Sequence, residues 1–130
     1  MKRMESAMLD FTKKLKSQPR YYRGLPDGTV IVQNYDRSGR YLLGLHHGVH
    51  VHHSPAVFAW GSDCKHARHL ALALCTDVLK EDDIRALRVH RQYLAQHVAA
   101  WPPGCKWGPI SDDEILLDII EIEHAIAIPD

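Results

Sequence analysis

Histidine and cysteine side chains gather in the middle of this 130-residue chain, where they could bind a metal. Neutral imidazole nitrogens and thiolates are good ligands for zinc. The candidate ligands are His50, His52, Cys64, His66 and His69. On a strand, His50 and His52 would share one face, and on a helix, His66 and His69 would do so. Because the chain has neither Cys-x-x-Cys nor His-Glu-x-x-His, a zinc-binding module or zinc enzyme is an alternative interpretation and not the leading one.

Nucleophilic catalysis has weaker support in the sequence. Ser54 follows two histidines, and Cys64 lies two residues before His66. An activated nucleophile needs a base in hydrogen-bond contact and a third group that orients it, and neighbours in sequence do not supply these. The pairs Asp82-Asp83 and Asp112-Asp113 stand at predicted helix starts, where capping explains them. We therefore expect a non-catalytic protein without a cofactor.

Charge is balanced overall but divided between the two ends of the chain. Sixteen Lys and Arg match sixteen Asp and Glu. Residues 1–23 hold seven basic and two acidic residues, a net charge of +5, whereas residues 111–130 hold seven acidic residues and no Lys or Arg. The neutral total is not typical of a dedicated nucleic-acid-binding domain. Charged ends of this kind can steer partners together.

Two sets of charged residues are therefore candidates for binding a partner. The sets are Asp113, Asp118, Glu121 and Glu123 near the C-terminus, and Lys13, Lys14 and Lys16 near the N-terminus. The acidic set would bind a basic protein. The basic set is followed by Arg20-Tyr-Tyr-Arg23, which mixes cations with aromatic rings and gives nucleic-acid binding as a further alternative.

The hydrophobic pattern predicts one α+β domain over residues 1–130. A short amphipathic helix is expected at 4–15, within an extension that ends at residue 19. Strands are expected at 20–23, 29–33, 40–45 and 57–60, so that residues 20–61 form a small antiparallel sheet of three to four strands. The first two form a hairpin around the turn at 25–28. Residues 62–130 are expected to add three helices that pack on the sheet.

Each of the three later helices has its own pattern. The helix over 65–79 is apolar on every side in its centre, which predicts burial, with Cys75 as a small core residue. The next helix begins near residue 81, and its expected apolar stripe is Ile84, Leu87, Leu94, Val98 and Trp101. The last begins at Ser111, three residues before Glu114, in the pattern of a capping box. This last helix has more apolar residues than one buried face needs, so a homodimer interface is a further alternative.

The compartment expected for this chain is the cytoplasm. Three cysteines without a disulfide spacing favour a reducing environment. No run approaches the roughly 20 apolar residues of a membrane span, and the N-terminus lacks the pattern of a secretory signal. We expect a protein partner and no membrane contact.

Several phrases resemble an uncharacterised family of small bacterial proteins associated with plasmids, phages and other mobile elements. The phrases are Tyr22-Arg-Gly24, His52-His-Ser-Pro55, Phe58-Ala-Trp-Gly61, Leu70-Ala-Leu-Ala-Leu74 with Asp77, the helix from Tyr93 to Pro102, and Ile110-Ser-Asp-Asp-Glu-Ile115. The likeness covers residues 21 to 122. Relatives follow the Trp-Gly phrase with a glycine-rich turn, whereas this chain has residues 62–66 with Cys64 and His66, so a metal site shared by the family is not expected. The resemblance implies an α+β fold, a mobile-element setting and no assigned reaction.

These observations together predict a non-catalytic binding protein of a mobile genetic element. It would act by protein–protein interaction, for instance by inhibiting a host defence system. The shared phrases are interpreted as fold-building: Phe58 and Trp60 would face the interior, and Gly61 would permit a sharp turn into the helix that follows.

Overall fold

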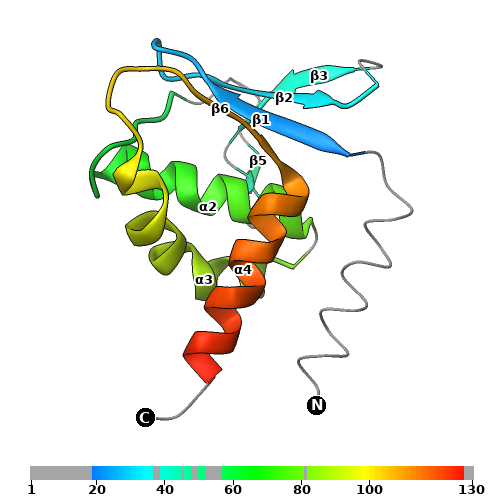
Figure 1. Cartoon of the computed structure of the whole chain (residues 1–130), viewed down its shortest axis with the longest axis vertical. Helices are drawn as coiled ribbons and strands as arrows, with labels where there is room; N and C mark the ends of the chain where they lie inside the picture. The colour runs from blue at the N-terminus through cyan, green and yellow to red at the C-terminus, as the bar shows by residue number, and fades with distance from the viewer. Residues whose placement is uncertain are drawn as a thin grey trace.

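The computed structural model of the protein (Figure 1) describes residues 19–36, 39–44, 46–47, 50–51, 57–80 and 82–127. The described elements confirm an α+β architecture, with one antiparallel sheet and a layer of helices. The helix predicted over 4–15 and the basic residues Lys13, Lys14 and Lys16 lie outside the described residues. So do His52, Ser54 and the side chain of His50.

Four antiparallel strands form the main sheet in the order β3-β2-β1-β6. They are β1 (Arg20–Gly24), β2 (Val30–Asn34), β3 (Arg40–Leu42) and β6 (Trp107–Ser111). The predicted hairpin of β1 and β2 is confirmed: the Gly28 amide donates to the Leu25 carbonyl at 2.9 Å, and Tyr22 lies opposite Val32. Gly28 has φ +89°, a conformation that glycine adopts without a steric penalty. A separate two-stranded ladder pairs β4 (His46–His47) with β5 (His50–Val51).

The fourth strand differs from the sequence prediction. Residues 57–60, expected as a strand, are irregular, although Phe58 and Trp60 are buried as predicted. The strand β6 instead comes from residues 107–111, between two helices, and pairs with β1 so that Tyr22 lies opposite Ile110. The sequence of β6 is a weak strand signal because Gly108 and Pro109 are residue types depleted in strands, and the run that remains is short. On the outer edge of the sheet, however, a proline is tolerated, because its missing N–H faces away from the neighbouring strand.

Three helices cover one side of the sheet (Figure 1). They are α2 (Lys65–Leu79), α3 (Asp83–Gln96) and α4 (Asp112–Ala127), with a short 3-10 turn η1 (Val98–Ala100) after α3. The centre of α2 is buried, Cys75 included, as its apolar sequence predicts. The Ser111 hydroxyl accepts a hydrogen bond from the Glu114 amide at 3.1 Å, which confirms the predicted cap of α4. None of the described helices is long and apolar enough to cross a membrane.

The apolar stripe predicted for α3 is partly wrong. Leu94 and Val98 are buried, but Ile84 is 71% exposed and Leu87 is also exposed. The buried face instead includes Ala86, Val89 and Tyr93, spaced at i, i+3 and i+7. The helix therefore directs Ala86, Val89 and Tyr93 into the core cluster, in place of the expected Ile84 and Leu87.

Candidate functional site

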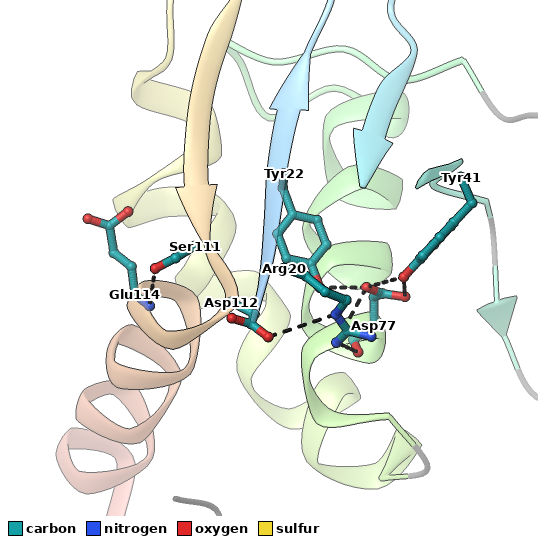
Figure 2. Close-up of polar contacts among 7 residues, drawn as sticks. All are labelled: Arg20, Tyr22, Tyr41, Asp77, Ser111, Asp112 and Glu114. Atoms are coloured by element: carbon teal, nitrogen blue, oxygen red, sulfur yellow. Dashed lines mark hydrogen bonds and ion pairs between the residues drawn. The ribbon is translucent and has the colours of Figure 1, made fainter. Parts of the chain in front are cut away.

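A cluster of polar side chains joins the inner face of the sheet to the helices (Figure 2). Asp77 of α2 lies at its centre. Its carboxylate accepts a hydrogen bond from the Tyr22 hydroxyl at 2.5 Å and from the Tyr41 hydroxyl at 2.9 and 3.0 Å. Tyr22 and Tyr41 both flank Val32 across neighbouring strands, so the pleat directs all three toward the helices. One carboxylate therefore ties two strands to α2.

Arg20 extends this cluster to a third element. Its guanidinium donates to the backbone oxygen of Asp77 at 3.1 Å and lies 3.8 Å from the Asp77 carboxylate. Its Nε lies 3.8 Å from the carboxylate of Asp112, the first residue of α4. The side chains of Arg20, Asp77 and Asp112 are all largely shielded from water. The first residue of β1 thus connects to both α2 and α4.

Burial sets the protonation states within this cluster. It raises the pKa of Tyr22 well above its usual value, and the nearby Asp77 carboxylate raises it further. The same two causes, in the same order, raise the pKa of Tyr41. Burial alone would lower the pKa of Arg20, but Tyr22 and the two carboxylates more than offset it. At neutral pH the tyrosines are therefore neutral donors and the arginine is charged, which suits a structural anchor.

The opposite face of the sheet presents a different set of side chains. None of the described helices covers it (Figure 1). We call this set the sheet platform, and its members are Tyr21, Arg23, Ile31, Gln33, Tyr35, Arg40, Leu42 and Pro109. Strand alternation places them there, since Tyr21 lies opposite Gln33 and Gln33 lies opposite Arg40 in the register.

A hollow of about 260 Å³ lies on the sheet platform. Its lining is Tyr21, Arg23, Gln33, Asn34, Tyr35 and Pro109. The rings of Tyr21 and Tyr35 lie 5.8 Å apart between centroids, with an interplanar angle of 40°. Tyr35 is 66% exposed, so a large part of its surface faces solvent beside the hollow. Two aromatic rings, a guanidinium and two amides thus surround one shallow concavity.

The acidic residues predicted to bind a partner divide into two groups. Glu123 forms an ion pair with Arg85 of α3 at 2.6 Å, and Asp118 lies 3.6 Å from His97. Burial raises the pKa of Asp118, although His97 acts in the opposite direction. These two carboxylates therefore help to join α3 to α4. Asp113 and Glu121 are exposed.

The predicted metal ligands that the structure describes lie at the start of α2. The rings of His66 and His69 lie 6.2 Å apart between centroids, so their helical spacing brings them together as expected. Cys64 is exposed, and a hydrogen bond with the Ser62 side chain lowers its pKa. Within the described part of the chain, no three His, Cys, Asp or Glu side chains are grouped closely enough to hold one metal ion. The zinc site that includes His50 and His52 stays a prediction.

The motif Phe58-Ala-Trp-Gly61, one of those that resemble the family, packs in the interior. The Trp107 ring stacks on Trp101, with centroids 4.2 Å apart, and meets Trp60 edge-on at 5.8 Å. The Trp60 indole donates to the Cys105 carbonyl at 3.0 Å. Gly61 has φ +84°, and a Cβ there would lie 2.7 Å from the Pro103 ring. The prediction that Phe58 and Trp60 face the interior is confirmed.

The fold defines a small α+β domain in which polar side chains anchor one face of the sheet to helices and no described helix covers the other face. A family of unknown function, DUF6166, matches residues 22–121, and the chain belongs to that family. The matched span runs from the third residue of β1 into α4. It includes the anchoring cluster (Arg20, Tyr22, Tyr41, Asp77 and Asp112) except Arg20, and the sheet platform except Tyr21. No curated protein and no solved structure matches the chain.

Neither the anchoring cluster nor the sheet platform was predicted from the sequence as a group of residues that lie together. Arg20, Tyr21, Tyr22 and Arg23 were expected to act together, but the alternation of β1 sends Tyr22 into the anchoring cluster and Tyr21 and Arg23 to the platform. One signal could have revealed the cluster: Asp77 is an acidic residue on a helix whose centre is apolar on every side. A carboxylate in that position needs buried partners.

Proposed function

We propose that this protein is a non-catalytic binding protein that holds a macromolecular partner on the sheet platform. The observation that supports this proposal is the hollow between Tyr21, Tyr35 and Arg23 on a face that no described helix covers. Tyrosine and arginine are the residue types that contribute most to binding at interfaces, since they offer large contact areas and several hydrogen bonds.

The anchoring cluster contributes to binding by making the platform rigid. Tyr22 alternates with Tyr21 and Arg23 along β1, so the residues on either side of it are fixed when its hydroxyl is bound to Asp77. Tyr41 does the same between Arg40 and Leu42 on β3. A rigid surface loses less conformational entropy when a partner binds.

The setting of this function is proposed from the family resemblance and the composition. We place the protein in the bacterial cytoplasm, in the service of a plasmid, phage or other mobile element. A protein partner, such as a component of a host defence system, is consistent with the small size of the chain and its polarised charge. The exposed Asp113 and Glu121 offer a second contact surface for a basic partner.

Affinity capture from a bacterial lysate tests the proposal. The bait proteins are the wild type, the platform variants Arg23→Glu and Tyr35→Ala, and the control Arg88→Glu, which changes an exposed arginine on α3. We expect one partner that the wild type and Arg88→Glu retain and Arg23→Glu loses. If Arg23→Glu and Tyr35→Ala capture the same partners as the wild type, the platform is not the binding surface. A turnover activity abolished by Cys64→Ala would also refute a non-catalytic function.

A further inference from the structure

The platform residues favour a different class of partner from the protein considered above. The inference rests on the proposed function only in taking the sheet platform as a binding surface: we infer that this surface binds single-stranded nucleic acid, with bases stacked on Tyr21 and Tyr35 and phosphates held by Arg23 and Arg40. Three features of the surface support this class of ligand: accessible aromatic rings, amides beside them, and the distribution of charge.

The aromatic rings come first, because an unpaired base always presents a flat face. Tyr21 and Tyr35 are tilted by 40° to each other at the edge of the hollow. A ring 66% exposed, as Tyr35 is, can be covered by a base without any change in the protein core. Stacking of this kind is independent of sequence and contributes about 1–3 kcal/mol per base. Paired bases in a duplex expose only their edges, so the same rings would discriminate against double strands.

The amide side chains come next. Gln33 and Asn34 line the same hollow as the two rings. An amide offers both a donor and an acceptor, which is what the edge of a base requires. Four strands spaced about 4.8 Å apart span roughly 14 Å. One class of RNA-binding domain shows that aromatic side chains on a four-stranded sheet can stack two or three bases.

Charge separates the platform from the helical side. Arg23 and Arg40 lie on β1 and β3, on either side of β2, and both are exposed. The acidic residues nearest to them in sequence are Asp27, in the turn after β1, and Asp36, after β2, each four residues away. On the helical side, α4 carries six acidic residues and no Lys or Arg. A phosphate chain would therefore be attracted to the platform and repelled by α4.

Fluorescence anisotropy with labelled oligonucleotides tests the inference. The probes are single-stranded oligo(dT) and oligo(U) of about ten nucleotides, together with a DNA duplex of equal length. We expect saturable binding of the single strands that weakens as salt rises, because phosphate contacts release counterions. Tyr21→Ala and Tyr35→Ala should each weaken binding roughly 5- to 100-fold, the range that loss of one stacked base implies. Tyr35→Phe, which keeps the ring, should bind as the wild type does.

Matched controls separate the platform from general effects. Arg23→Gln should reduce both the affinity and its salt dependence, whereas Arg88→Gln on α3 should change neither. Leu117→Ala removes an exposed apolar side chain from α4 and controls for the tyrosine truncations. All platform variants change exposed or half-buried side chains, so unchanged tryptophan fluorescence verifies their fold.

Two results would overturn the inference. One is the absence of single-strand binding at concentrations up to about 100 µM, the weak end of non-specific affinity. The other is binding that persists unchanged in Tyr21→Ala, Tyr35→Ala and Arg23→Gln. If either result is found, and the capture experiment yields a protein that Arg23→Glu loses, the proposed function stands and the partner of the platform is a protein. If neither a protein nor an oligonucleotide depends on the platform, the proposed function fails as well.

Discussion

Replacing Asp77 by alanine is the sharpest test of how the sheet is held on the helices. The substitution removes the acceptor of the Tyr22 hydroxyl, which is fully buried, and of the Tyr41 hydroxyl. It also removes one of the two carboxylates that face Arg20. Alanine favours the helical conformation, so the backbone of α2 adds no cost of its own.

The expected loss can be worked out from these partners. A buried hydroxyl left without its acceptor costs about 1–3 kcal/mol. Breaking a buried ion pair costs about 3–5 kcal/mol, but Arg20 keeps Asp112 and the backbone oxygen of Asp77, so its share lies well below that range. Tyr41 is half exposed, and water replaces its lost bond at little cost. We expect Asp77→Ala to lower the free energy of unfolding by about 3–5 kcal/mol.

Urea unfolding followed by tryptophan fluorescence measures this loss, because Trp60, Trp101 and Trp107 lie together in the core cluster or packed against it. A double-mutant cycle isolates the bond itself. Tyr22→Phe should cost about 1–2 kcal/mol in the wild type and almost nothing in the Asp77→Ala background. A loss below about 1 kcal/mol for Asp77→Ala, or an equal cost of Tyr22→Phe in both backgrounds, would refute the anchoring role.

Three further predictions concern other parts of the fold. Gly24→Ala should destabilise the protein by about 1–3 kcal/mol or more in urea, because a Cβ would overlap the Trp107 indole. The free energy of unfolding should fall as pH rises above about 10, where tyrosines of the unfolded chain ionise. The reason is that burial, and then Asp77, raise the pKa of Tyr22 in the folded state. Tyr22→Phe should make this fall less steep. A thiol reagent should modify Cys64 in the native protein but reach Cys75, whose pKa burial raises, only on unfolding.

Each of these predictions has a control. Gly39→Ala places its Cβ at an ordinary 3.7 Å from the Asn34 side chain and should be close to neutral. An alkaline slope identical in the wild type and Tyr22→Phe would contradict the role assigned to burial. Equal modification rates for the two thiols in the native state would show that α2 does not bury Cys75 as described.

The predictions from sequence succeeded where a single element carries its own signal. The local sequence alone indicates the turn at 25–28 and the buried helix α2. Ser111 and Glu114 likewise indicate where α4 begins. The strand β6 was missed because its pairing with β1 joins residues about 85 positions apart and its own sequence contains Gly108 and Pro109. Local preference is a poor guide where packing decides the conformation.

The candidate site was harder to predict than the fold for a related reason. The sheet platform is formed by residues on four strands and a loop, and the register that aligns Tyr21, Gln33 and Arg40 is not visible in the linear order. The rotation of α3 shows the same limit: Ile84 and Leu87 fit a helical repeat as well as the buried Ala86 and Val89 do. Only the space left by the neighbouring helices selects between the two faces.

The pairing of β6 with β1 also determines how late in synthesis the main sheet can be completed. The hairpin and β3 leave the ribosome early, but one edge of β1 has no strand beside it until residue 111 has emerged. Until then the nascent chain exposes an edge that could pair with another chain. Closing such a long loop slows folding, so the final step of assembly comes after most of the polypeptide is made.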